Sequence, residues 1–293
     1  MGWFEERGGL EGTVAIVTGG AGGLGEAITT DLVANGVKVA ALDIDGDAVD
    51  ALRQRLDAQG ADAVLVQGDA RDPEVLERLF AQVDETWGRL DTLVNVPGGT
   101  FRANFEDTRP KGWDTLIRMN LTHVLHSCSL AIPRMKAGGR GGSIITMTTI
   151  EAHRAAPGFA VYSAAKAGVT EFTRTLSVEV APYGIRVNCV APDITPTPNM
   201  IALAGGDTTG TGARDNGPQI AIPMGRTGIP TDVSGSVVFL ASGLSRYITG
   251  TTLHPDGGTY ASSGWFNWPD TGWQNSPPPA VLDFLAGRDP SGA

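Results

Sequence analysis

The sequence predicts an α/β protein, a single doubly wound parallel sheet of about seven strands with helices on both faces. Short runs rich in valine, isoleucine and leucine alternate with segments of helical periodicity. A glycine cluster separates the first apolar run from the first helix. Strands that are apolar on both faces are typical of parallel sheets, and right-handed crossovers between them produce the doubly wound arrangement.

The strands are expected at the short apolar, β-branched runs. Their ranges are residues 13–18, 37–42, 63–67, 90–95, 142–148, 185–190 and 252–255. The helices are expected between them, where apolar residues recur at helical spacing. Their ranges are residues 26–35, 47–59, 73–87, 113–136 and 162–181, with a bend in the fourth near Pro133.

One domain is expected over residues 1–262, because no linker interrupts the alternation, which starts near residue 9. Residues 199–222 lack a sustained apolar period and are interpreted as a substrate loop, since long loops inside compact domains are usually functional. Residues 263–293 form a tail rich in tryptophan and proline. Its large aromatic side chains favour packing against the parent fold or a neighbouring subunit.

Composition limits the class of partner. The chain carries 22 basic and 32 acidic residues, which argues against a nucleic-acid partner. Glycine is frequent, at 40 of 293 residues, but follows no repeat. Cys128 and Cys189 lack metal-ligand spacing and are expected to be buried thiols, so no metal site is expected. Without a membrane-length apolar run or a signal sequence, we expect a soluble cytoplasmic protein with no membrane partner.

The glycine cluster at residues 18–25 predicts a dinucleotide site. Gly19, Gly23 and Gly25, with Leu24, lie between a strand and a helix, where glycine lets the backbone approach a pyrophosphate. The helix that follows presents free N–H groups to the phosphates. An ordinary glycine-rich loop is the alternative, but the position between strand and helix favours the binding site.

Asp43, at the end of the second strand, favours NAD over NADP. Its carboxylate can accept both hydroxyls of the adenosine ribose and repels a 2′-phosphate. No arginine or lysine lies between Thr18 and Lys38 to hold that phosphate. The alternative is that Asp43 caps the turn, a role for which Asp45 competes.

Asp69 and Ala70 follow the third strand and are expected at the adenine. The alternative for Asp69 is a local bond to the backbone of Arg71 or Asp72.

Tyr162 and Lys166 are four residues apart and therefore share one face of the expected helix. A lysine ammonium near a phenol favours the phenolate and lowers the pKa of the tyrosine. With the positive charge of an oxidised nicotinamide nearby, Tyr162 would serve as a general base near neutral pH. The alternative, a pair of surface helix residues, is less favoured because a dinucleotide motif precedes it.

Several motifs in this order resemble the short-chain dehydrogenase/reductase family over nearly all of residues 9–262. Beside the glycine turn and the tyrosine–lysine pair, they are Asn120, residues 187–192, residues 223–226, residues 239–242, residues 248–250 and residues 256–258. The resemblance implies a Rossmann-type fold and an NAD(P)-dependent enzyme acting on CH–OH groups. It also implies a homo-oligomer, often a tetramer, paired through the helices that bear Asn120 and Tyr162.

Roles follow from the resemblance residue by residue. Tyr162 would exchange the proton, Lys166 would hold the nicotinamide ribose, and Asn120 would hold a water behind Lys166. Thr149 stands where the family usually has serine and would bond the substrate oxygen. The residues expected at the cofactor are Gly19, Gly23, Leu24, Gly25, Asp43, Asp69, Ala70, Asn95, Tyr162, Lys166, Pro192, Thr195 and Thr197.

Three residues depart from the family pattern. Thr149 adds a methyl group that stiffens its χ1 angle. Pro97 removes a backbone donor after the fourth strand. Asp193 replaces a glycine near the expected nicotinamide site, where aspartate tolerates a positive φ better than most residues.

The remaining polar candidates are interpreted from their positions relative to Thr149 and Asn120. Glu151 and His153 follow Thr149 and are candidates for the substrate pocket. His123 and His126 are interpreted as helix-face or subunit-contact residues rather than catalysts.

The sequence therefore predicts an NAD-dependent oxidoreductase that interconverts a secondary alcohol and a ketone, with Tyr162 as general acid and base. Two alternatives stay open. One is an NADPH-dependent ketoreductase of the same family, and the other is a dinucleotide sensor that has lost catalysis, as the altered Thr149 and Asp193 would allow.

Overall fold

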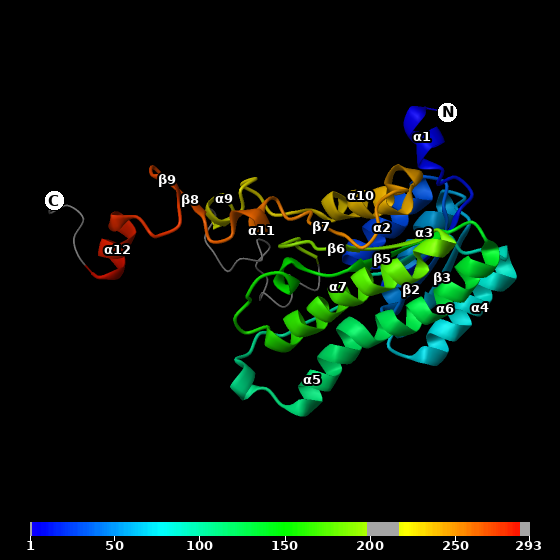
Figure 1. The fold of residues 1–293 in the computed structure, drawn as a ribbon, viewed down its shortest axis with the longest axis horizontal. Helices are drawn as coiled ribbons and strands as arrows, with labels where there is room; N and C mark the ends of the chain where they lie inside the picture. Colours follow the sequence, from blue (N-terminus) through cyan, green and yellow to red (C-terminus); the bar gives the residue numbers. More distant parts are fainter. Residues whose placement is uncertain (1, 198–216, 288–293) are drawn as a thin grey trace.

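The computed structural model describes residues 2–197 and 217–287, and its centre is a seven-stranded parallel sheet of strand order β3-β2-β1-β4-β5-β6-β7 (Figure 1). Every neighbouring pair in this sheet is parallel, as the apolar runs predict. The strands are β1 (Val14–Thr18), β2 (Lys38–Asp43), β3 (Ala63–Gln67), β4 (Thr92–Asn95), β5 (Gly142–Met147), β6 (Ile185–Val190) and β7 (Thr252–Leu253).

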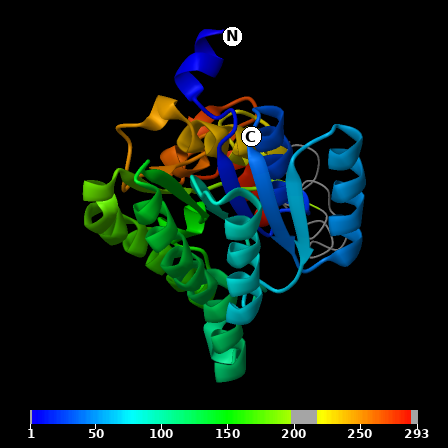
Figure 2. The same ribbon diagram turned by 90° about the vertical axis from the view of Figure 1, so that its right-hand side faces the viewer.

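Helices cover both faces of the sheet (Figure 2). One face is covered by α4 (Pro73–Trp87), α6 (His123–Gly138) and α7 (Ala160–Val180), which share a core with β1, β4 and β5. The other face is covered by α2 (Gly23–Ala34), which packs against α10 (Pro230–Ala241). The remaining helices are α1 (Trp3–Gly8), α3 (Gly46–Ala58), α5 (Pro110–Ile117), α9 (Gly217–Ala221), α11 (Thr259–Ser262) and α12 (Pro279–Leu285).

The strand order reverses between β1 and β4. In open α/β sheets, ligands bind outside the carboxyl ends of the strands at such a reversal. The glycine turn after β1 and the loops after β4, β5 and β6 all lie at this edge. The topology therefore places the predicted cofactor and catalytic residues at one end of the sheet.

Most elements lie within a residue or two of the predicted ranges. The bounds of β3, β6 and α4 coincide with them. The helix predicted over residues 113–136 is present as a continuous helical stretch, in which α5 and α6 are joined by a π-helical segment, Arg118–Thr122. The π-helical segment contains Asn120, and Pro133 lies inside α6.

The helix α10 was not predicted from the sequence. Its residues include Gly235 and several valines, a composition that carries no clear helical period. Packing against α2 stabilises it, and Pro230 at its first turn fits a helix start because the missing N–H has no partner to lose.

The C-terminal segment extends from the body of the molecule (Figure 1). It contains a two-stranded antiparallel hairpin, β8 (Phe266–Trp268) and β9 (Gly272–Gln274), followed by α12. The strand β8 lies against α9, as the expected packing on the parent fold requires. Trp265 and Trp273 stay about half exposed, at 49% and 46%. Of the predicted substrate loop, residues 199–216 lie outside the described residues.

The expectation of two buried thiols is met. Cys128 and Cys189 are free and buried, and burial raises the pKa of their thiols to about 12 and about 11, respectively. Within residues 2–197 and 217–287, no helix is long and apolar enough to cross a membrane.

Replacing Phe80 by alanine tests the core between the sheet and α4. The ring is fully buried in the cluster that joins α4 to β1 and β4. We expect the free energy of unfolding to fall by about 3–5 kcal/mol, measured by urea denaturation. Val178→Ala on α7 is the control, because Val178 is 75% exposed, and should change the value by less than about 0.5 kcal/mol. Equal losses in the two variants would contradict this packing.

Candidate active site

The glycine turn after β1 is shaped by steric constraints that only glycine meets. Gly19 and Gly23 have φ angles of +66° and +54°, in the left-handed region that side chains disfavour. A Cβ atom at Gly25 would lie 1.7 Å from the carbonyl oxygen of Gly19. The helix α2 can therefore begin directly against the turn, and the predicted assignment of these glycines to a close approach is consistent with the geometry.

Asp43 connects the end of β2 to this turn by a hydrogen bond. Its Oδ2 accepts a hydrogen bond from the backbone N–H of Ala21 at 3.0 Å, and its Oδ1 accepts one from Asp45 N–H at 3.1 Å. Asp45 is the N-cap of α3 and accepts from Ala48 N–H at 3.1 Å. Asp45 is thus the helix cap, Asp43 makes the local turn bond that was its alternative role, and its contact with a ribose stays a prediction.

The loop after β6 faces the glycine turn. A Cβ atom at Gly23 would come within 3.1 Å of Thr197. Thr195 is buried, and its hydroxyl donates to the carbonyl of Asp193 at 3.2 Å, while Pro192 accepts from Ile150 N–H at 3.3 Å. The turn and the loop therefore face each other across the expected cofactor crevice, and the contacts of Pro192, Thr195 and Thr197 with a cofactor stay predictions.

Asp69 makes the local hydrogen bond to Arg71 that the sequence left open as the alternative to an adenine contact. Its Oδ1 accepts from Arg71 N–H at 2.9 Å, and its Oδ2 pairs with Arg71 Nη2 at 2.6 Å. These bonds from Arg71 hold the pKa of the Asp69 carboxyl below its usual value. The contact of Asp69 and the neighbouring buried Ala70 with an adenine stays a prediction.

Asn95 and Asn120 are both fully buried. Asn95 supports β4 as expected, because its Oδ1 accepts from Ser127 at 2.6 Å and its Nδ2 donates to Thr146 at 3.3 Å. Asn120 lies in the π-helical segment and bonds both backbone groups of Gly99, donating to the carbonyl at 2.8 Å and accepting from N–H at 3.2 Å. The wider π turn thus places Asn120 against the loop after β4.

Lys166 and Asn120 meet at Gly98. A Cβ atom at Gly98 would lie 3.0 Å from Lys166 Nζ and 3.1 Å from Asn120 Oδ1. The ammonium is 2% exposed and donates to the carbonyl of Met147 at 2.8 Å. Burial lowers the pKa of Lys166 to about 8. The predicted neighbourhood of Lys166 and Asn120 is therefore present.

The balance of forces on Tyr162 differs from the expected one. The pKa of Tyr162 is raised to about 12, chiefly by loss of hydration; a hydrogen bond with Thr149 lowers it, and the negative charge of Glu151 raises it. Loss of hydration is the largest of these effects, and the expected lowering of this pKa by Lys166 together with a bound oxidised nicotinamide stays a prediction.

Thr149 occupies the position expected beside Tyr162, and its hydroxyl is buried. It donates to Glu151 Oε2 at 2.5 Å. Glu151 in turn pairs with Arg154, an arginine that no motif in the sequence had indicated, at 3.0 Å. Glu151 therefore contacts Thr149 directly.

His153 belongs to a small aromatic cluster. Its ring packs edge-on against His254 at 4.9 Å and lies 5.7 Å from Tyr260, which stacks on His254. It joins the loop after β5 to the segment after β7. Its place in a substrate pocket stays a prediction.

The structure also accounts for Pro97 and Asp193, two of the three residues that depart from the family pattern. Pro97 packs 3.1 Å from the position of a Cβ on Gly19, and its carbonyl bonds Nε2 of the buried His123 at 3.2 Å. His123 is thus a core residue, not a surface or contact residue, and burial lowers its pKa to about 3. Among the described residues only Ser263 and Asp270 are non-glycine residues with positive φ, so Asp193 needs no glycine conformation.

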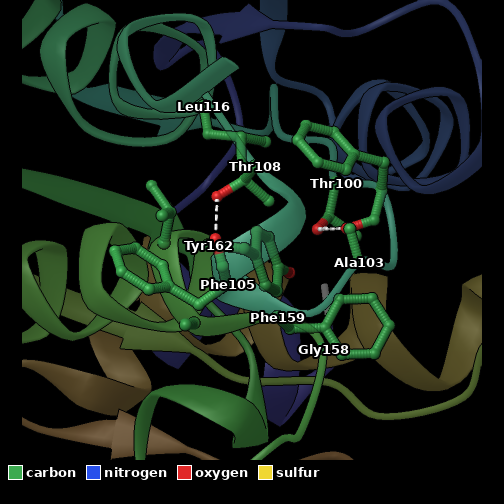
Figure 3. Close-up of a pocket in the computed structure, with 11 residues that line it drawn as sticks. Thr100, Ala103, Phe105, Thr108, Leu116, Gly158, Phe159 and Tyr162 are labelled. Carbon is green, nitrogen blue, oxygen red and sulfur yellow. Dashed lines mark hydrogen bonds between the residues drawn. The ribbon is translucent and has the colours of Figure 1, made fainter. Parts of the chain in front are cut away.

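A small pocket of about 10 Å³ adjoins Tyr162 (Figure 3). Phe101, Phe105, Phe159 and Leu116 line it, with the threonines Thr100 and Thr108 among them. Phe105 stacks on Trp113 at 5.3 Å, which anchors that wall. Sequence motifs did not indicate this wall, because its aromatic residues lie in irregular segments; their clustering between residues 101 and 113 was the available signal.

The fold and this site define a class of protein, and comparison with known proteins agrees. A family model described as enoyl-(acyl carrier protein) reductase matches residues 19–260. The chain belongs to the short-chain dehydrogenase/reductase family. It is accordingly an NAD(P)-dependent oxidoreductase acting on CH–OH groups, and the alternative of a non-catalytic sensor is set aside.

Among curated relatives, the chain is 36% identical to the 3-oxoacyl-[acyl-carrier-protein] reductase of Haemophilus influenzae, over 86% of this chain and 100% of that protein. It is 35% identical to the cyclohexanol dehydrogenase of Rhodococcus sp. (strain TK6), over 86% and 98% of the two chains. A solved short-chain type dehydrogenase/reductase from Mycobacterium marinum superposes with a TM-score of 0.78 at 27% identity, covering 85% of this chain and 96% of that one.

Gly25→Ala tests the glycine turn as a cofactor site. Its added methyl group would meet the Gly19 carbonyl, and relieving such overlap typically costs about 1–3 kcal/mol. We expect dinucleotide affinity, measured by calorimetry, to fall about 10- to 100-fold. Gly22→Ala is the matched control, because a Cβ there meets nothing within 4 Å. Unchanged affinity in Gly25→Ala would rule out the crevice as the binding site.

Proposed function

We propose that this enzyme prefers NAD and interconverts a secondary alcohol and a ketone, with Tyr162 as the general acid and base. The observation that carries the proposal is the meeting of the Thr149 and Tyr162 hydroxyls beside an apolar cavity, with Lys166 buried nearby. Two hydroxyls at one point suit a single substrate oxygen. The apolar cavity suits the carbon skeleton attached to it.

The crevice fits a dinucleotide. Side chains at Gly19, Gly23 and Gly25 would fill the space at the turn. The start of α2 offers free N–H groups to the phosphates. These residues would hold the pyrophosphate, Asp43 the adenosine ribose, and Lys166 the nicotinamide ribose. When bound, the dinucleotide supplies the acceptor or donor of the hydride.

The chain's own residues hold and protonate the reacting oxygen. Thr149 and Tyr162 bond the substrate oxygen and orient the carbinol carbon toward the crevice. In ketone reduction Tyr162 gives its proton to the oxygen. The ammonium of Lys166, within reach of Asn120, stabilises negative charge that develops on the phenol oxygen.

The preference for NAD rests on Asp43. Its carboxylate stands at the rim of the glycine turn, held there by Ala21 N–H. A 2′-phosphate would bring negative charge against it, and neither the turn nor α2 carries a basic residue between Thr18 and Lys38.

A second candidate is reduction of a 3-oxoacyl group with NADPH. The observation in its favour is the 36% identity to a 3-oxoacyl-[acyl-carrier-protein] reductase. The alcohol reaction is supported by similar identity to a cyclohexanol dehydrogenase and by the aromatic lining of the pocket beside Tyr162, which suits an apolar carbon skeleton.

As to assembly, we propose a homotetramer, and light scattering of the purified protein tests it.

Tyr162→Phe keeps the ring and removes the hydroxyl. Because the hydroxyl carries the proton to or from the substrate oxygen, we expect kcat/KM for cyclohexanol oxidation to fall at least about 100-fold, with NAD affinity unchanged. Tyr183→Phe is the control, since Tyr183 is exposed and lies after α7. A Tyr162→Phe enzyme as fast as wild type would contradict the assigned mechanism.

Cofactor choice is tested by calorimetry with NAD and NADP. We expect wild type to bind NAD more tightly, and Asp43→Ser to reduce that preference by about 10- to 100-fold, the range for a hydrogen bond to a charged group. Asp47→Asn removes an equal charge from the first turn of α3 and should leave the preference as it was. Tighter binding of NADP to wild type would favour the 3-oxoacyl alternative.

A further inference from the structure

Asp193, in the loop after β6, carries a buried carboxylate with one unused oxygen. Its side chain is 9% exposed, and its Oδ2 has no hydrogen-bond partner among the described residues. Thr259 and the backbone of Ile194 lie close by and lower its pKa, but the Thr259 hydroxyl donates to the carbonyl of Asp256 at 2.8 Å. A buried oxygen without a donor is costly, so Oδ2 indicates a donor that the chain itself does not supply.

The nearest cation, Arg154, is directed chiefly to Glu151. Arg154 Nη2 lies 3.0 Å from Glu151 Oε1 but 3.9 Å from Asp193 Oδ1. One guanidinium therefore serves two carboxylates, and the contact with Asp193 is too long for a hydrogen bond. A donor that reached Oδ2 would form a charge-assisted hydrogen bond, which is about twice as strong as a neutral one.

Asp193 is connected to the place expected for the reacting oxygen. Glu151 accepts from the Thr149 hydroxyl through its other oxygen, at 2.5 Å. Pro192, which precedes Asp193, accepts from Ile150 N–H at 3.3 Å. The loops after β5 and β6 are therefore joined beside Thr149. A polar group on the substrate carbon next to the reacting one is the group that this arrangement suits.

We propose that Asp193 is a specificity-determining residue, whose Oδ2 accepts a hydrogen bond from a second hydroxyl group next to the carbinol that is oxidised. The substrate class is then a vicinal diol with an apolar remainder. The inference rests on the proposed function and deepens it, since Tyr162 still exchanges the proton of the reacting hydroxyl. The second hydroxyl keeps its proton and takes no part in the redox step.

The charges of the site favour a hydroxyl over an ammonium as the donor. Lys166 is buried, with its ammonium bonded to the carbonyl of Met147 at the end of β5. An oxidised dinucleotide would add a second positive charge at the same edge of the sheet. Both would repel a substrate ammonium, whereas a hydroxyl donates to Asp193 without that cost.

The first experiment compares kcat/KM for cyclohexanol with that for cyclohexane-1,2-diol, in its cis and trans forms, with saturating NAD. At pH 8 the Asp193 carboxyl, whose pKa burial raises to about 6, is ionised. We expect wild type to prefer one form of the diol about 10- to 100-fold, the value of a hydrogen bond to a charged group. Equal values for cyclohexanol and both diols, or a preference for 2-aminocyclohexanol over them, overturn the proposal.

Two variants assign the preference to Asp193. In Asp193→Ala the preference for the diol should disappear, because the acceptor is gone. Glu151→Gln is the matched control: it removes the same charge from the same polar group, and both Glu151 oxygens already have partners. It should keep the preference. A general loss of stability lowers both kcat/KM values alike and leaves their ratio readable. A diol preference that survives in Asp193→Ala overturns the proposal.

Binding without turnover separates this inference from the proposed function. Both 1-methylcyclohexanol and 1,2-dimethylcyclohexane-1,2-diol contain only tertiary alcohols, which hydride transfer cannot oxidise. By calorimetry with NAD bound, wild type should hold the diol about 10- to 100-fold more tightly, and Asp193→Ala should not distinguish the two. Equal binding by wild type overturns the proposal, as does lower NAD affinity in Asp193→Ala with the diol preference intact. A normal preference without oxidation of any secondary alcohol contradicts the proposed function alone.

Discussion

The contact of Gly25 with the carbonyl oxygen of Gly19 is the constraint on which the rest of the site depends. No side chain fits between them, so α2 starts at the end of β1 and directs its free N–H groups across the sheet edge. Asp43 then ties the neighbouring strand to the same turn. The loop after β6 faces it at Thr197. One close backbone approach thereby sets the position of the crevice relative to Tyr162 and Lys166.

The site divides into a polar side and an apolar side. Thr149, Glu151, Arg154 and Asp193 form a connected polar group, in which burial and the charge of Glu151 raise the pKa of Asp193 to about 6. Aromatic side chains line the cavity on the other side of Tyr162. In the proposed function, a substrate oxygen would lie at the boundary between them, with the polar group on one side and the carbon skeleton on the other.

Sequence patterns were most informative where a single local force decides the structure. Continuous apolar runs marked every strand of the main sheet, and the glycine turn and the Tyr162–Lys166 spacing indicated the site. The helix α10 and the π-helical segment around Asn120 depend on tertiary packing, which local periodicity does not encode. The raised pKa of Tyr162 and the bond between Thr149 and Glu151 depend on burial and on distances across loops. Spacing along the chain contains neither quantity.

Transfer of a labelled hydrogen tests the central claim, that this site moves a hydride between a carbinol carbon and a dinucleotide. Cyclohexanol carrying deuterium at its carbinol carbon is incubated with the enzyme and NAD, and the reduced dinucleotide is analysed by mass spectrometry. Direct hydride transfer places one deuterium in each molecule of reduced dinucleotide, because the carbinol hydrogen moves to the dinucleotide and the O–H proton leaves separately. Reduced dinucleotide without deuterium, with the label released to solvent, would contradict it.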